Sequence, residues 1–225
     1  MPKNHYSDKV SHYFGSERYE MIEFIPSETK NLLEVGCGEG CFGARLKQLK
    51  NIKVTGIEPD QHASKAASLV LDRVLNLDID AGISELLDSK FDCIVFNDVL
   101  EHLIDPWDSL QRIITLLTPS GFIVSSIPNI RYMPAFKDFV IHGNWRYQRD
   151  GVMDRTHLRF FTKRSINDLF SLAGYEVTKL QGINGILFPW KYAILNALLG
   201  GHLEDTRYQQ YACVARPVGK QDSLQ

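Results

Sequence analysis

Residues 31–43, NLLEVGCGEGCFG, carry the first residue pattern that could do chemistry: an apolar run, a carboxylate, and glycines on alternate positions. A glycine lets the main chain turn sharply, or lets a ligand approach without a Cβ in the way. Gly36, Gly38 and Gly40 supply three such places, with Cys37 between the first two. The pattern indicates a turn whose main chain lies against a ligand.

The residues on either side predict the elements that hold this turn. The run that ends in Glu34 and Val35 is short and apolar enough for a buried parallel strand, and a helical pattern resumes at Phe42. The dinucleotide fingerprint G-x-G-x-x-G is the obvious alternative, but counted from Gly36 its third glycine would fall at Cys41. A nicotinamide dehydrogenase is therefore disfavoured.

A second carboxylate ends the next predicted strand, over residues 53–57. Glu58 precedes Pro59 and follows Gly38 by 20 residues. At this spacing an acidic side chain can accept hydrogen bonds from ribose hydroxyls. A charge at a helix N-terminus is the alternative role. The position directly after a buried strand favours the ribose role and hence an adenosine ligand.

Polar residues also follow the third and fourth predicted strands. Asp78 and Ile79 come after a strand over 74–77, and Asn97 follows the apolar run 91–96. Together with E-x-G-x-G-x-G, the stretch FDCIVFNDVLEHLIDPWDSL resembles motifs of the class I S-adenosylmethionine-dependent methyltransferases. Its V-L-E-H element is similar to one that is typical of a large subgroup of these enzymes, which acts on small molecules.

This resemblance implies a cofactor site for S-adenosylmethionine, with S-adenosylhomocysteine as the product. Asp78 would bond the adenine amino group, Ile79 would pack on the ring, and Asn97 would lie beneath the sulfonium. The residues expected to bind the cofactor are Glu34, Gly36, Cys37, Gly38, Gly40, Glu58, Pro59, Asp78, Ile79 and Asn97.

Length and composition favour one ordinary globular domain, with 225 residues, 44% hydrophobic and 23% charged. The formal charge of −2 argues against nucleic-acid binding. Residues 1–13 are polar and do not resemble a signal peptide, and no apolar stretch is long enough to span a bilayer, so we expect a cytoplasmic protein. We expect all four cysteines to be reduced, and no metal, because no cluster has ligand spacing.

Five strands alternating with helices predict an α/β fold with a doubly wound, mostly parallel sheet. Residues 118–121 have the composition of a turn before the fifth strand. Two more strand candidates, 175–181 and 208–215, fit an antiparallel last pair, and the resemblance implies seven strands in the order 3-2-1-4-5-7-6. We expect a single domain over 1–225. It begins with a helical N-terminal brace (1–30, with a helix over 6–25) and a cofactor-binding core (31–127), followed by a substrate cap inserted after strand 5 (128–164). The last helix and strand pair, with an apolar helix at 186–200, cover 165–216, and a tail covers 217–225.

The predicted cap differs from the rest of the chain in charge. Residues 131–164 contain eight Lys and Arg against three Asp, a local charge of +5 that leaves −7 elsewhere, and aromatic residues are interleaved with them. Such a lining suits an anionic substrate that carries a ring, for example a nucleotide-linked or pyrophosphate-linked sugar. A cap whose arginines merely cover apolar surface is the alternative.

Within the cap, the string DRTHLRFFT over 154–162 resembles a motif of methyltransferases found with bacterial surface-polysaccharide genes. A sugar hydroxyl attacks a methyl group only as its proton leaves, and a neutral histidine is a natural acceptor for that proton. We therefore expect His157 to be the base or to orient the hydroxyl, with Asp154 as its partner. A buried structural role for His157 is equally open, and His102 is either a structural anchor or a substrate contact.

Two other functions fit the same sequence. The V-L-E-H subgroup also serves phenols and quinone precursors, and the chain could be a non-enzymatic cofactor-binding partner of a glycosyltransferase. The apolar run ILFPWKYAILNALL over 186–199 is too short to span a bilayer. We expect it to pack in the core or a homodimer; peripheral contact with a membrane is the alternative.

Overall fold

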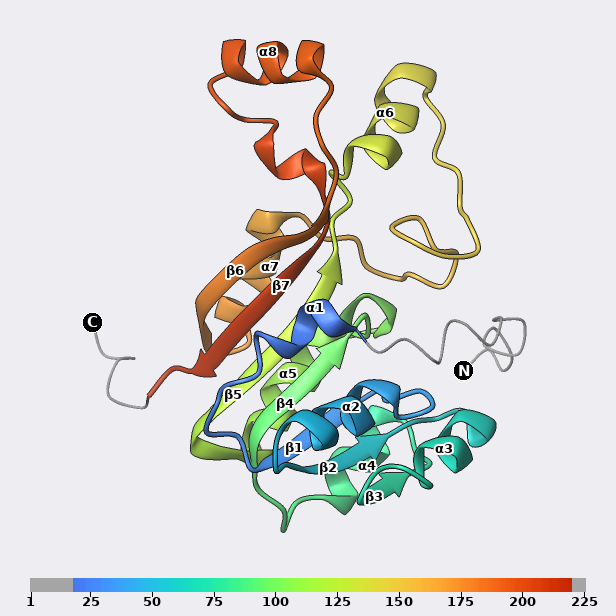
Figure 1. The fold of residues 1–225 in the computed structure, drawn as a ribbon, viewed down its shortest axis with the longest axis vertical. Coiled ribbons are helices and arrows are strands. Elements are labelled where there is room, and N and C mark those ends of the chain that lie inside the picture. The colour runs from blue at the N-terminus through green and yellow to red at the C-terminus, as the bar shows by residue number, and fades with distance from the viewer. Residues whose placement is uncertain (1–17, 220–225) are drawn as a thin grey trace.

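The computed structural model describes residues 18–219. Its centre is a seven-stranded sheet in the order β3-β2-β1-β4-β5-β7-β6, parallel except for β7, which runs antiparallel to both neighbours (Figure 1). This confirms the predicted fold class and strand order. The strands are β1 (Asn31–Val35), β2 (Lys53–Ile57), β3 (Arg73–Leu75), β4 (Phe91–Asn97), β5 (Leu117–Pro128), β6 (Tyr175–Gly185) and β7 (Tyr208–Pro217).

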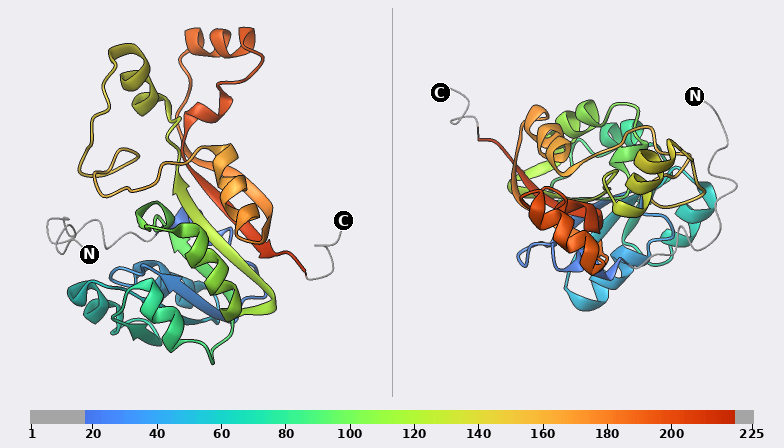
Figure 2. Two further views of the ribbon diagram at one scale, coloured as in Figure 1. Left: turned by 180° about the vertical axis from the view of Figure 1, so that it is seen from behind. Right: turned by 90° about the horizontal axis from the view of Figure 1, so that it is seen from above.

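Helices cover both faces of the sheet, as its apolar faces require. One core cluster joins the sheet to α4, α5 and α7, and a second joins it to α1, α2 and α3 (Figure 2). The helices are α1 (Tyr19–Ile22), α2 (Cys41–Leu49), α3 (Gln61–Ala67), α4 (Ile79–Glu85), α5 (Pro106–Ile113), α6 (Met133–His142), α7 (Lys163–Leu172) and α8 (Trp190–Leu198), with short 3-10 helices η2 (Leu100–His102), η3 (Ile114–Leu116) and η4 (Glu204–Arg207).

The chain departs from the sequence prediction at two places near its strands. The predicted turn over 118–121 belongs instead to β5, which begins at Leu117 and shifts register against β4 between Phe91 and Cys93. The predicted helix over 6–25 lies partly outside the described residues. In its described part, residues 18–25, only α1 is helical.

Two connections project from the same end of the sheet (Figures 1 and 2). One follows β5 and carries α6 and the irregular segment before α7; the other joins β6 to β7 and carries α8. No residue of α8 is buried, so the expectation that it packs in the core is wrong. Within residues 18–219, no helix is long and apolar enough to cross a bilayer.

Candidate active site

The glycine turn joins β1 to α2 and lies at the carboxyl edge of the sheet. Gly36, Gly38 and Gly40 have φ values of +67°, +54° and +80°, in the left-handed region that glycine adopts without strain. A Cβ on Gly36 would lie 2.7 Å from a methyl carbon of Val99. The Gly36 N–H donates to the carbonyl of Ile57 at 2.8 Å, which ties the turn to β2. Both backbone conformation and close packing therefore require glycine at position 36.

Glu58 ends β2 and connects the glycine turn to the next loop. Its carboxylate accepts the N–H of Gly38 at 2.8 Å and the N–H of Asp60 at 2.9 Å. Burial raises the pKa of the Glu58 carboxyl, while the two N–H donors oppose that rise. The structure thus brings together two residues that the sequence placed 20 positions apart.

Asp78 and Ile79 lie at the start of α4, after the neighbouring β3. The Asp78 carboxylate caps the helix by accepting the N–H of Ala81 at 2.9 Å. The Asn76 amide donates to the carbonyl of Glu58 at 2.9 Å and so links this loop to the end of β2. The loops after β1, β2 and β3 therefore lie together at this edge of the sheet. The adenine contacts expected of Asp78 and Ile79 stay predictions.

Glu34 and Cys37 are held inside the protein next to the glycine turn. Glu34 is 3% exposed, and its carboxylate lies so close to α2 that a Cβ on Gly43 would be 2.7 Å from its oxygen. Burial raises the pKa of Glu34 to about 8. Burial also raises the pKa of the Cys37 thiol, which keeps it protonated at neutral pH. Glu34 therefore packs against α2 and Cys37 against β2. The cofactor contacts expected of these two residues stay predictions.

Asn97 ends β4, the central strand of the parallel part of the sheet. Both amide atoms of its side chain are shielded from solvent and have no hydrogen-bond partner in the part of the chain that the structure describes. A buried polar group without a partner costs roughly 1–3 kcal/mol, so such groups usually face a ligand or ordered water. The orphaned amide of Asn97 therefore fits a ligand that lies at this end of β4.

Asp98 follows Asn97 and connects four elements, a role that the sequence analysis missed. One of its carboxylate oxygens lies 2.5 Å from a guanidinium nitrogen of Arg18; the other accepts the Gln210 amide at 2.6 Å and the Ser126 hydroxyl at 3.0 Å. Its φ of +55° is unusual for a residue with a side chain. The only signal in the sequence was that a second polar residue directly follows the end of the strand.

The V-L-E-H element and the DRTHLRFFT string lie side by side. The main-chain carbonyl of Glu101 accepts the N–H groups of Leu158 at 2.8 Å and Arg159 at 3.0 Å. A ring nitrogen of His102, Nδ1, lies 3.1 Å from the carbonyl of Thr156. The two motifs that carried the family resemblance therefore form one local structure.

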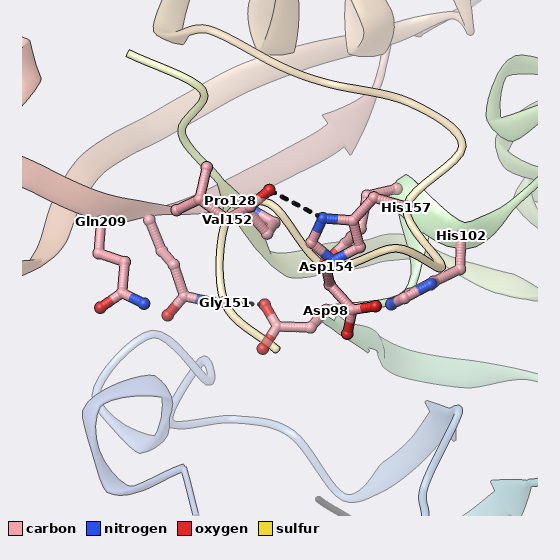
Figure 3. Close-up of a pocket in the computed structure, with 10 residues that line it drawn as sticks. Asp98, His102, Pro128, Gly151, Val152, Asp154, His157 and Gln209 are labelled. Carbon is pink, nitrogen blue, oxygen red and sulfur yellow. Dashed lines mark hydrogen bonds and ion pairs between the residues drawn. The ribbon is translucent and has the colours of Figure 1, made fainter. Parts of the chain in front are cut away.

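A cavity of about 60 Å³ lies between these motifs (Figure 3). The imidazole of His157 lies in its wall, with ring nitrogen Nδ1 at 3.1 Å from the carbonyl of Val152. Because a carbonyl only accepts, this contact places a hydrogen on Nδ1 and leaves Nε2 as the acceptor of the neutral ring. The cavity is lined by Asp98, Glu101, His102, Pro128, Gly151, Val152, Asp154, His157, Gln209 and Gln210.

Two buried carboxylates, those of Glu101 and Asp154, belong to residues that line this cavity. Glu101, at 1% exposure, has a carboxylate oxygen 3.9 Å from Nε2 of His157, a partner that the sequence analysis did not predict. The carboxylate of Asp154 accepts the N–H of Thr156 at 2.8 Å and its hydroxyl at 2.7 Å. The ring centroids of His102 and His157 are 4.8 Å apart. The structure thus gathers all three predicted catalytic residues at one cavity.

Glu101, His102 and His157 also offer ligand atoms that lie within 4.8 Å of one another, a set that could hold a metal ion. Spacing along the chain could not reveal this set, because the third member comes from the cap. The absence of a metal stays a prediction.

A second, larger cleft of about 480 Å³ adjoins the small cavity. Gly151, Val152 and Gln209 line both spaces, so the two are neighbours. Lys137 and Arg146 give the cleft positive charge, and Asp138 and Asp150 lie in the same wall. These four charges balance, so the cationic lining expected from the sequence stays a prediction.

The sheet order, the glycine turn, the carboxylate after β2 and the orphaned amide after β4 define a class I S-adenosylmethionine-dependent methyltransferase. Residues 7–180 match the family model described as a methyltransferase domain, and the chain belongs to that family. Its cofactor is S-adenosylmethionine, which the orphaned amide of Asn97 and the buried carboxylate of Glu58 fit.

Similar proteins are methyltransferases by name and differ in the substrate that their names give. The ubiquinone biosynthesis O-methyltransferase of Cereibacter sphaeroides is 26% identical over 174 residues, 74% of this chain and 69% of that protein. The ribosomal protein L11 methyltransferase of Thermosipho africanus is 31% identical over 119 residues, 52% of this chain and 44% of that protein. A solved methyltransferase from Archaeoglobus fulgidus superposes with a TM-score of 0.64 at 19% identity, over 87% of this chain and 90% of its own.

Proposed function

We propose that this methyltransferase transfers a methyl group to a hydroxyl oxygen of an anionic saccharide or sugar conjugate, in the cytoplasmic synthesis of surface polysaccharides. The observation that carries the proposal is the pair of connected spaces in the cap. The small cavity holds His102 and His157 next to the end of β4, and the adjoining cleft presents Lys137 and Arg146. A sugar ring near the histidines and a phosphate group in the cleft would use both.

The cofactor would be held at the carboxyl edge of the sheet. Bound there, S-adenosylmethionine supplies an electrophilic methyl group on a sulfonium. In our proposal Glu58 binds the ribose hydroxyls, Asp78 and Ile79 bind the adenine, and Asn97 uses its orphaned amide. The positive φ values of Gly36, Gly38 and Gly40 shape the turn that would lie against the cofactor.

His157 is our proposed general base. With hydrogen on Nδ1 toward Val152, its Nε2 can accept the hydroxyl proton, and imidazole has a reference pKa of about 6.5. The carboxylate of Glu101, 3.9 Å from Nε2, would stabilise the imidazolium, and Asp154 would help to hold the loop. His102 would orient the acceptor. A positioned base of this kind contributes roughly 10²–10⁴ in rate.

The test replaces His157 by Asn, which keeps a donor near the carbonyl of Val152 but removes the base. We expect kcat to fall about a hundredfold or more, with the melting temperature and the affinity for S-adenosylhomocysteine near those of the wild type. His62→Ala, at an exposed position on α3, is the matched histidine control and should leave kcat unchanged. If His157→Asn turned over at the wild-type rate, His157 would not be the general base and its role would be structural.

A small phenolic or quinone-type acceptor is the second candidate. It is favoured by the relative named for ubiquinone biosynthesis and by aromatic rings in the cap, where Trp145 and Phe160 lie edge to face with centroids 5.2 Å apart. Comparing nucleotide sugars and sugar phosphates with phenols as acceptors separates the two. Arg146→Gln should raise KM only for anionic acceptors. Tight binding of S-adenosylhomocysteine without turnover on either class would favour a non-catalytic partner of a glycosyltransferase.

A further inference from the structure

The two helices that project beyond the sheet are apolar yet unburied. Neither α6 nor α8 has a buried residue, although both contain mostly apolar side chains. Both lie at the same end of the molecule (Figures 1 and 2). Contiguous apolar surface of this kind on a folded protein usually marks an interface.

The outer side of α8 is the more apolar side. Leu187 lies just before the helix, and Trp190, Ile194 and Leu198 follow one another at four-residue steps, so these three form one stripe along it. In chain order, the exposed fractions of the four side chains are 87%, 69%, 53% and 79%. The apolar stripe therefore faces away from the protein.

The opposite side of α8 fixes it to the loop before β7. The Tyr192 hydroxyl lies 2.9 Å from the hydroxyl of Thr206, and the Asn196 side chain accepts the N–H of Leu203 at 2.8 Å. These polar contacts hold the helix so that its stripe stays outside. On α6, the neighbouring residues Phe139, Val140 and Ile141 are likewise exposed.

Both projecting helices carry a lysine, and α6 also carries Asp138, whose carboxylate lies 3.1 Å from a ring nitrogen of His142. Residues 186–203 contain Lys191 and no acidic residue. Lys137, Arg146, Arg149 and Lys191 form no ion pair within residues 18–219. The acidic residues at the base of this arm, Glu204 and Asp205, are each within 2.9 Å of an arginine. Within residues 18–219, the two projecting helices therefore combine exposed apolar groups with two lysines that form no ion pair, Lys137 on α6 and Lys191 on α8.

We infer that the surface formed by α6 and α8, here called the docking surface, binds an anionic lipid bilayer. Interfacial helices combine a Trp- and Leu-rich face with Lys and Arg in this way, and each cation near an anionic surface adds to the attraction. A second copy fits less well, because it would bring another cap of charge +5 against the first. The inference extends beyond the proposed acceptor, because docking concerns the outer surface of α6 and α8, whatever group is methylated.

The test measures binding of the full chain to vesicles of phosphatidylcholine with and without phosphatidylglycerol. We expect binding to the anionic vesicles and quenching of Trp190 by brominated acyl chains, absent in Trp190→Phe. Leu187→Glu with Leu198→Glu should lower the partition coefficient about a hundredfold, and Lys191→Gln on α8 about fivefold at low salt. The matched control is Leu69→Glu with Leu172→Glu, whose leucines are 86% and 70% exposed elsewhere; it should bind like the wild type.

Equal vesicle binding by the Leu187/Leu198 variant would overturn the inference. So would a lipid-free dimer that this variant dissociates, with no vesicle binding by the wild type, because the surface would then be a contact between copies. The outcome is separable from the proposed function: methyl transfer to a water-soluble acceptor should persist in the Leu187/Leu198 variant, and vesicle binding should persist in His157→Asn.

Discussion

The glycine turn leads into helix α2, and the docking surface is formed by helices α6 and α8. The two regions differ in how closely their residues are packed. At the turn, main chain and side chains pack closely enough that a single added carbon on Gly36 would overlap Val99. On α6 and α8 no residue is buried. The first region is closely packed, which leaves little freedom to vary, and in our proposal its shape holds the cofactor. The second presents surface chemistry, which can change without unfolding the domain. The following predictions test this contrast.

The largest effect is expected from Glu34, whose pKa burial raises to about 8. In the unfolded chain this carboxyl loses its proton near its ordinary pKa of 4.5, whereas the folded protein keeps it until about pH 8. Over this range the folded state binds more protons, so the free energy of unfolding should fall as pH rises, by up to roughly 4 kcal/mol. Below the range both states are protonated, and this contribution is complete.

Urea denaturation at pH 5 and pH 8 measures this loss. Glu34→Gln mimics the protonated group and should reduce the difference between the two pH values. Glu176→Gln, at an exposed residue paired with Arg216, is the control and should leave it unchanged. An undiminished pH dependence in Glu34→Gln would show that other groups cause it.

A smaller loss is expected from Gly36→Ala, which combines a positive φ with a contact of 2.7 Å to Val99. We expect it to lower the free energy of unfolding by about 2–3 kcal/mol and to weaken binding of S-adenosylhomocysteine. Gly151→Ala in the cap has the same backbone strain, at φ +76°, but nothing within 4 Å of the added carbon. It should cost about 1 kcal/mol.

Thermal denaturation compares the two glycine variants, and calorimetry measures their cofactor affinity. Adding Val99→Ala to Gly36→Ala removes the overlap and leaves only the backbone strain, so it should recover part of the loss. Equal costs for Gly36→Ala and Gly151→Ala would mean that close packing at the turn contributes nothing.

The sequence predicted the closely packed region better than the exposed one, for a physical reason. Buried parallel strands need apolar runs, so β2 was predicted with its bounds and β1 and β4 to within a residue or two. The run at 186–199 offers no such constraint, because an apolar helix has the same sequence whether it packs in a core or projects from it. Its exposure became evident only in three dimensions.

The polar residues of the candidate site show a similar difference, between residues at a short fixed spacing and contacts that join distant parts of the chain. The sequence singled out Glu58 because it follows Gly38 by 20 residues, and the structure joins the two through the Gly38 N–H, while the ribose contact stays a prediction. The ion pair of Arg18 with Asp98 and the bond of Gln210 to Asp98 were not predicted, since they join residues far apart in the chain, 112 positions in the second case. Likewise, the approach of Glu101 to His157 depends on how the cap folds back over η2.

The smallest effect is expected from Leu198→Ala in α8, where the side chain is 79% exposed. With no packing to lose, the free energy of unfolding should change by less than about 0.5 kcal/mol. Leu46→Ala in α2 removes a leucine that is fully buried, and it should cost about 2–5 kcal/mol because it leaves a cavity. If denaturation without lipid showed a loss above about 1 kcal/mol for Leu198→Ala, α8 would already be covered in solution, by the chain itself or by a second copy. A neutral result leaves the stripe free for a bilayer, since only an uncovered leucine can be removed without cost.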